Sequence, residues 1–308
     1  MKKIIVPPIK IQGIKTKLVE WISLHVPNFS WRRIEPFMGS GVVGFNIVPK
    51  NAIFSDINPH TIKFYQEINN WNINHLMVRN FLEQEGEFLK EQGEKHYKYV
   101  RDRFNAEQST LDFLFLNRSD FNGMIRFNKK WGFNVPFGKK PERFSKAYIT
   151  KIVNQVRNLE VLMQQNNREF ICRDFEEIIK IANSNDFLYC DPPYLWRNVD
   201  YFDSRSEADE IKLNTLLTDS VARFILSTRH SNTYRTNEYL STVRWNFKIL
   251  TKEHFYHLWG KKENRNAMKE AIVMNYEIVE VASVKKNSIS IPKNVFVNES
   301  LFDPILEY

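Results

Sequence analysis

The chain has 308 residues, of which 43% are hydrophobic and 26% are charged, so it can bury a sizeable core and is not mainly disordered. Lys and Arg outnumber Asp and Glu by 44 to 36, and the resulting net charge of +8 favours a polyanionic partner such as nucleic acid. Because it has only two cysteines and no apolar run near the roughly 18 residues of a membrane helix, we expect a cytoplasmic protein without a disulfide framework or a membrane partner.

The first part of the chain alternates between predicted helices and strands. In chain order, the predicted elements are a helix over 14–25, a strand over 33–37, a glycine turn over 38–41, a helix over 42–48 and a strand over 52–55. The second strand closes on Asp56, and a further helix begins at Asn58 and Pro59, a position at which proline is favoured. Strands that alternate with helices predict a parallel sheet.

The middle of the chain has a different pattern. From 72 to 105, charged residues recur at helical spacing without any strand pattern, which predicts a solvent-facing helical insertion. From 118 to 140, glycine, asparagine, basic and aromatic residues crowd together without a period, which indicates irregular loops and short hairpins.

The alternation resumes after a predicted helix over 145–166. Further strands are predicted over 169–172, 187–190, 222–227 and 270–276, with another candidate over 246–250. The last thirty or so residues give no signal. We therefore expect an α/β fold with a doubly wound, mostly parallel sheet that is interrupted by a mainly helical insertion.

Three acidic residues follow predicted strands, and a glycine turn follows a fourth strand. Asp56, Asp174 and Asp191 all fall at carboxyl ends, where open parallel sheets bind their ligands. A glycine turn lets a ligand approach the backbone closely, and a neighbouring acid can accept hydrogen bonds from ribose hydroxyls. The pattern predicts a site for a nucleoside-containing cofactor. The alternative is that each glycine or acid only ends a strand or caps a helix.

The sequence Asp191-Pro192-Pro193-Tyr194 is the most specific motif. Its prolines rigidify the chain beyond a buried strand, Asp191 and the Pro192 carbonyl offer two acceptors, and Tyr194 offers a flat face for stacking. Such a clamp suits a planar ring with an exocyclic amino group, because two acceptors on the amino hydrogens help to direct the nitrogen lone pair toward an electrophilic methyl group. The structural alternative is a plain turn.

Together these motifs resemble those of the Dam-like, D12 class (alpha group) DNA adenine-N6 methyltransferases. Residues 35–41 resemble the cofactor loop of that family, 191–194 its catalytic motif and 9–15 its amino-terminal cofactor motif. Residues 116–138 resemble its DNA-contacting segment, and 269–276 its closing strand. The order, with the cofactor loop first and the catalytic motif last, is that of the alpha group.

The resemblance implies a methyltransferase (Rossmann-like) domain that binds S-adenosylmethionine, formed by 1–67 and 168–280. It also implies a DNA-recognition domain over 68–167, which leaves 281–308 unassigned. The implied cofactor-binding residues are Lys10, Ile11, Lys15, Pro36, Phe37, Gly39, Ser40, Gly41, Asp56, Ile57, Asp174, Phe175 and Asp191. The implied catalytic residues are Asp191, Pro192, Pro193 and Tyr194.

Residues 118–140 also indicate a nucleic-acid surface independently of the resemblance, because basic and aromatic side chains alternate there. Lysines best serve phosphates, whereas Arg and Asn can reach base edges. The expected DNA-binding residues are Arg118, Asn122, Arg126, Asn128, Lys139 and Lys140. A target base must be flipped out of the duplex to reach the pocket. The alternative is a solvated basic loop whose aromatic residues pack inward.

The expected function is therefore site-specific transfer of a methyl group to adenine N6 in double-stranded DNA, as the modification part of a restriction-modification system with a possible cognate restriction endonuclease. The alternatives are methylation of cytosine N4 or of an RNA base, and a non-catalytic DNA-binding subunit. No metal is expected, since His254 and His257 have no evident third ligand. The recognition sequence, the oligomeric state and the biological setting are left open by the sequence.

Overall fold

The computed structural model describes residues 3–27, 32–47, 50–165, 167–193, 206–231, 240, 246–255 and 267–277. The site candidates Tyr194 and His257 and the segment 281–308 lie outside these residues, as does the end of the helix predicted over 42–48. The described part therefore contains the predicted cofactor and DNA segments and all but the last residue of the 191–194 motif.

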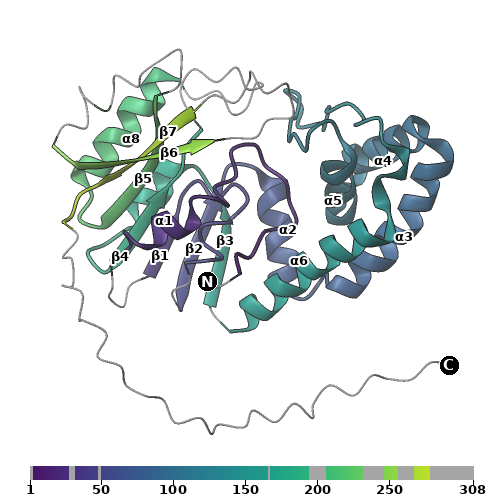
Figure 1. Ribbon diagram of the computed structural model, residues 1–308, viewed down its shortest axis with the longest axis horizontal. Helices are drawn as coiled ribbons and strands as arrows, with labels where there is room; N and C mark the ends of the chain where they lie inside the picture. The colour runs from purple at the N-terminus through teal and green to yellow at the C-terminus, as the bar shows by residue number, and fades with distance from the viewer. Residues whose placement is uncertain are drawn as a thin grey trace, which may run out of the picture. The chain divides into compact units, whose positions relative to one another are not determined.

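A mostly parallel sheet forms the centre of the fold (Figure 1). Its strands are β1 (Arg32–Glu35), β2 (Asn51–Asp56), β3 (Asn167–Cys172), β4 (Asp186–Cys190), β5 (Arg223–Ser231), β6 (Lys248–Phe255) and β7 (Ala267–Met274). They lie in the order β3-β2-β1-β4-β5-β7-β6. The pairs from β3 to β5 are parallel, and β7 runs antiparallel to both β5 and β6. The predicted α/β fold with a mostly parallel sheet is confirmed.

Six of the described helices begin after a residue whose side chain caps them. The described helices are α1 (Val19–Ser23), α2 (Pro59–Asn69), α3 (His75–Gln92), α4 (Glu94–Glu107), α5 (Thr110–Ser119), the 3-10 turn η1 (Pro141–Phe144), α6 (Lys146–Gln164), α7 (Phe175–Lys180) and α8 (Glu207–Asp219). Asn58 caps α2 by accepting from the backbone N–H groups of His60 and Thr61, and Ser145 and Asp174 cap α6 and α7 in the same way. None of the described helices is long and apolar enough to cross a membrane.

Two predicted helices near the amino terminus are shorter than expected. In place of the helix over 14–25, only Val19–Ser23 is helical. In place of the helix over 42–48, the described residues form consecutive turns. The Asn46 N–H donates to the carbonyl of Val43, three residues earlier, whereas the Phe45 N–H donates to the carbonyl of Gly41, four residues earlier. The Asn46 side chain donates to the Ile5 carbonyl at 2.8 Å, so this turn is fixed by a long-range contact that helical spacing could not reveal.

The sheet buries both of its faces, because successive strand residues point to opposite sides. On β2, Phe54 belongs to a core cluster that extends through α2 and α6, whereas Ile53 belongs to a second cluster beneath α7 and α8. The sheet is therefore doubly wound, and its carboxyl edge is left open for a site.

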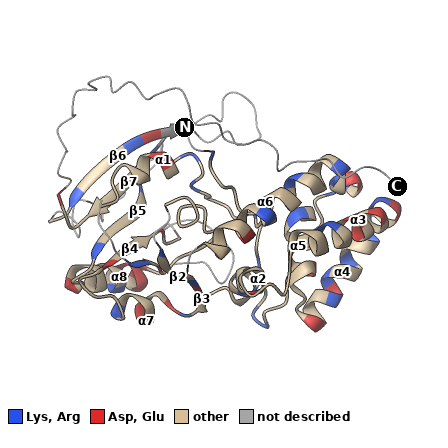
Figure 2. Ribbon diagram, turned by 90° about the horizontal axis from the view of Figure 1, so that it is seen from below, with Lys and Arg blue, Asp and Glu red and all other residues tan. Residues whose placement is uncertain are grey.

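The helices α3–α6 form the insertion, drawn on the right of Figure 1. The expectation that 72–105 faces solvent is wrong for the inner faces of α3 and α4, where Leu82, Leu89 and Tyr97 are almost fully buried. These residues belong to the same cluster as Phe54 of the sheet. Figure 2 shows many charged residues along α3 and α4, and most of them are exposed, because an amphipathic helix buries only one stripe; Glu85 is buried.

Candidate active site

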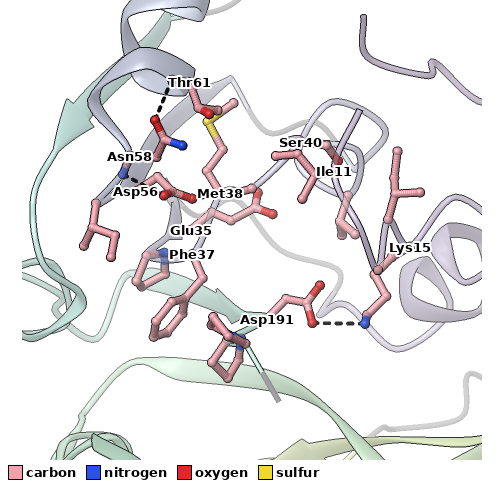
Figure 3. Close-up of a pocket in the computed structure, with 18 of the residues that line it drawn as sticks. Ile11, Lys15, Glu35, Phe37, Met38, Ser40, Asp56, Asn58, Thr61 and Asp191 are labelled. Carbon is pink, nitrogen blue, oxygen red and sulfur yellow. Dashed lines mark hydrogen bonds and ion pairs between the residues drawn. The ribbon is translucent and has the colours of Figure 1, made fainter. Parts of the chain in front are cut away.

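A cavity of about 310 Å³ opens at the carboxyl edge of the sheet (Figure 3). Residues from seven segments line it: 11–15, the end of β1 with its continuation to Val43, the β2 end with the start of α2, 124–125, 174–175 after β3, 189–193 at the end of β4, and Asp209 of α8. The wall consists of Ile11, Gln12, Gly13, Ile14, Lys15, Glu35, Pro36, Phe37, Met38, Gly39, Ser40, Val42, Val43, Asp56, Ile57, Asn58, Thr61, Met124, Ile125, Asp174, Phe175, Tyr189, Asp191, Pro192, Pro193 and Asp209. Separate motifs of the sequence therefore meet in one cavity.

The glycine turn after β1 is fixed by backbone geometry. Gly39 and Gly41 have φ angles of 51° and 72°, which side chains rarely adopt. A Cβ atom on Gly41 would lie 2.5 Å from the Phe45 ring, so this position has no room for a side chain. Gly41 does not line the cavity itself but shapes the turn that does.

Asp56 at the end of β2 accepts two hydrogen bonds from backbone N–H groups, from Gly39 at 2.8 Å and from Asn58 at 3.0 Å. Burial raises the pKa of Asp56, and these bonds oppose the rise. The carboxylate thus ties the glycine turn to the start of α2 while it faces the cavity (Figure 3).

Two stacked aromatic rings form part of the cavity wall near the end of β3. The rings of Phe37 and Phe175 stack with their centroids 5.1 Å apart and an angle of 27° between their planes. Asp174 precedes Phe175 and is exposed, and its carboxylate accepts from the N–H of Glu176 at 2.9 Å. The predicted pair 174–175 therefore supplies an aromatic surface beside an accessible acid.

The catalytic motif begins at the far end of the cavity, after β4. Asp191 Oδ1 lies 3.2 Å from Lys15 Nζ, and the side chains of Asp191 and Lys15 are 21% and 3% exposed (Figure 3). Burial raises the pKa of Asp191 to about 6; Lys15 lowers this pKa, and Glu270 raises it. Pro192 and Pro193 line the cavity next to Asp191.

Lys10 is the one predicted cofactor residue whose side chain points elsewhere. It does not line the cavity; its backbone N–H donates to the side chain of Asn117 at 2.8 Å, and its Nζ lies 5.8 Å from the centre of the Tyr148 ring. Lys10 therefore connects the amino-terminal segment to α5 and α6.

Several lining residues were not predicted. Glu35 is 2% exposed and its Oε2 lies 3.4 Å from Arg33 Nε; burial raises the pKa of Glu35 to about 7. Glu35 lies within the strand predicted over 33–37, and the structure ends this strand at Glu35, which places its carboxyl group at the edge of the sheet. Met124 and Ile125 come from the expected DNA segment, and only the tertiary structure shows that they reach this cavity.

The expected DNA-binding residues do not share one environment. Asn122, Asn128, Lys139 and Lys140 are exposed, and Arg126 is partly exposed. Arg118 is 4% exposed, and its guanidinium donates to Gln155 at 3.0 Å, so the structure places it inside the protein as a support for this segment. The Asn128 side chain accepts from the N–H groups of Lys130 and Gly132 and thereby closes a tight turn.

The aromatic residues of the same segment are divided between the interior and the surface. Phe127, Phe133 and Phe137 are buried, whereas Phe121 and Trp131 are 50% and 38% exposed. The alternative of a loop whose aromatic residues all pack inward therefore holds for three of these five side chains. Within the described residues, no group of three or more His, Cys, Asp or Glu side chains could hold a metal ion.

Comparison with known proteins identifies similar sequences. A family model described as the D12 class N6 adenine-specific DNA methyltransferase matches residues 12–258. A protein named DNA adenine methylase from Vibrio cholerae is 35% identical over 193 residues, which cover 60% of this chain and 64% of that protein. The Type II methyltransferase M.MjaIII from Methanocaldococcus jannaschii is 29% identical over 301 residues, which cover 88% of this chain and 99% of that protein. The match thus spans less than two thirds of the Vibrio protein.

Proposed function

The chain belongs to the D12 class of N6 adenine-specific DNA methyltransferases, and we propose that it transfers a methyl group from S-adenosylmethionine to adenine N6 in a short duplex DNA sequence. The observation that carries the proposal is that one cavity joins the glycine turn, the Asp56 carboxylate and the Lys15-bound Asp191. The first two features suit a nucleoside, and the third suits an amino group that receives a methyl.

The cavity fits the proposed cofactor in size and in chemistry. Its volume of about 310 Å³ lies within the range of small-molecule sites. Asp56 offers a carboxylate to ribose hydroxyls, and the Phe37–Phe175 pair offers a flat apolar wall to a purine. The turn from Phe37 to Gly41 allows close approach to the backbone, and Lys15 and Asp191 are proposed to hold the methionine end of the cofactor. When bound, S-adenosylmethionine supplies an electrophilic methyl group.

Asp191 and the Pro192 carbonyl act on the adenine amino group as hydrogen-bond acceptors. With S-adenosylmethionine bound, the amino nitrogen would receive the methyl group that the cofactor supplies, and the surplus amino proton would pass to water. Asp191 must be ionised for this role, and Lys15 favours the ionised form. Tyr194, which follows the described residues, is proposed to stack on the flipped base.

The chain is divided between catalysis and DNA recognition. We assign the sheet, from 1–67 and 168–280, to catalysis and 68–167 to target recognition. In the latter, Arg126 and the exposed asparagines are proposed to reach base edges and the exposed lysines to contact phosphates. We further propose that the enzyme acts in the cytoplasm as the modification partner of a restriction endonuclease with the same target sequence.

The test is transfer of labelled methyl from S-adenosylmethionine to unmethylated duplex DNA, followed by digestion to nucleosides and a map of the methylated sites. N6-methyladenine confined to one short sequence is the expected product. Label on cytosine, or on RNA only, would replace the proposed reaction by methylation of another amine. Tight DNA binding without any transfer would instead support a non-catalytic subunit.

A further inference from the structure

A second buried carboxylate lies next to Lys15. Glu270 belongs to β7 and is fully buried, and its Oε2 lies 3.9 Å from Lys15 Nζ. Lys15 Nζ is also 3.2 Å from Asp191 Oδ1, so one ammonium group bridges two carboxylates. Glu270 does not line the cavity, and it therefore acts on the site through Lys15 rather than through a bound molecule.

Basic residues lie opposite Glu270 on both neighbouring strands of the sheet. In the antiparallel register, Glu270 lies directly opposite Arg229 of β5 and Lys252 of β6. Residues that are directly opposite on antiparallel strands project from the same face. Basic residues therefore occupy the two sheet positions paired with Glu270, and Lys15 forms an ion pair with its carboxylate.

The groups that face Asp191 come from every neighbouring element. Lys15 comes from the amino-terminal segment, Glu270 from β7 and the Ser227 hydroxyl from β5. Glu35 of β1 and Tyr189 of β4 also interact with Asp191 electrostatically. Burial and Glu270 raise the pKa of Asp191, whereas Lys15 and Ser227 lower it, so the sum leaves the carboxyl near a pKa of 6.

We propose that Glu270 is a positioning residue that shares the Lys15 ammonium group with the Asp191 carboxylate and thereby sets the charge balance there. The consequence for catalysis rests on the proposed function, in which Asp191 accepts a hydrogen bond from the target amino group. A more basic carboxylate accepts such a bond more strongly. Glu270 shares Lys15 with Asp191 and repels the Asp191 charge, so it keeps the pKa of Asp191 raised. Lys15 opposes this effect and keeps Asp191 ionised at neutral pH.

The first test measures Asp191 directly. The protein is labelled with carbon-13 at aspartate carboxyl groups, the Asp191 signal is assigned by its loss in Asp191→Asn, and its titration is followed by NMR. In Glu270→Gln, we expect the midpoint of the Asp191 titration to fall by about one pH unit, because the negative charge that shares Lys15 with Asp191 is removed. The matched control is Glu253→Gln, which removes an exposed carboxylate from the adjacent strand β6 and should leave the midpoint unchanged.

The second test is kinetic. In Glu270→Gln, we expect the acid limb of the kcat profile to move to lower pH, while kcat at pH 8 falls about 3- to 10-fold and KM for DNA stays the same. An unchanged Asp191 midpoint in Glu270→Gln, or an equal shift in Glu253→Gln, would overturn the proposal. If Glu270→Gln does not fold, Glu270→Asp moves the charge away by one methylene, and the midpoint should fall by a smaller amount; an unchanged midpoint there would also overturn it.

The two readouts separate this proposal from the proposed function. If the wild-type protein transfers no methyl to DNA, the proposed function fails, yet the NMR titration still reports whether Glu270 controls Asp191. If methyl transfer is normal and the titration midpoint of Asp191 is the same in Glu270→Gln as in the wild type, only the positioning role of Glu270 fails.

Discussion

The cavity at the sheet edge and the segment 118–140 both contain residues that the sequence predicts to be functional, but the structure treats them differently. In the cavity, Phe37, Asp56 and Asp191 lie together as predicted, because parallel strands bring their carboxyl ends to one edge. In the segment, Arg118 is buried while Arg126 reaches the surface. A position at the end of a parallel strand therefore predicts that a residue lies at the cavity. Residue type alone, in an irregular loop, does not predict which side chains reach the surface.

The largest effect is expected at the cavity. Asp191→Ala removes the carboxylate proposed to accept a hydrogen bond from the target amino group, and methyl transfer should fall at least about 100-fold. The loss should be equal on all DNA substrates, because this residue acts on the reacting group rather than on the sequence. The measurement is the single-turnover rate of transfer from labelled S-adenosylmethionine at saturating DNA.

Asp219→Ala is the matched control for that substitution, since it removes an exposed carboxylate at the end of α8. It should transfer methyl at the wild-type rate. Activity of a folded Asp191→Ala protein within a few fold of the wild type would remove Asp191 from the mechanism and would leave the cavity without its proposed catalytic group.

The sequence predicts the structural features that depend on neighbouring residues, but not those that depend on contacts between residues far apart in the chain. The ends of β3 and β4, the glycine turn and the start of α2 are local, and the structure contains them where the sequence indicates. The burial of Arg118 depends on Gln155, 37 residues away, and the broken helix after Gly41 depends on Ile5. Glu270 meets Lys15 across 255 positions of the chain, so no local pattern could have revealed their ion pair.

Two arginine substitutions should distinguish a residue that stabilises the segment 118–140 from one that lies on its surface. Arg118→Ala removes a buried guanidinium that donates to Gln155 and lies 5.0 Å from the centre of the Tyr148 ring. We expect the free energy of unfolding to fall by about 2 kcal/mol, because a hydrogen bond and close packing are lost. Arg126→Ala should change it by less than about 0.5 kcal/mol, because this side chain is partly exposed. Urea denaturation measures both.

Arg126→Ala should instead act on specificity. Its guanidinium is held by Asn134, through Nε to the side chain at 2.8 Å and through Nη2 to the carbonyl at 3.0 Å, which orders it before DNA arrives. If it contacts a base, methyl transfer should fall more on the cognate site than on sites changed at one base pair. An equal loss on both kinds of site would assign it to the DNA backbone.

The smallest effect is expected from the exposed lysines. Lys139→Ala should weaken DNA binding for all sequences alike and reduce the slope of log affinity against log salt by about 0.9, since one phosphate contact releases about that many counterions. Lys50→Ala removes an equivalent exposed charge at the amino end of β2, the edge opposite the cavity, and should leave the slope unchanged. Equal slopes for the two variants would mean that the net charge of the whole protein, rather than this segment, attracts DNA.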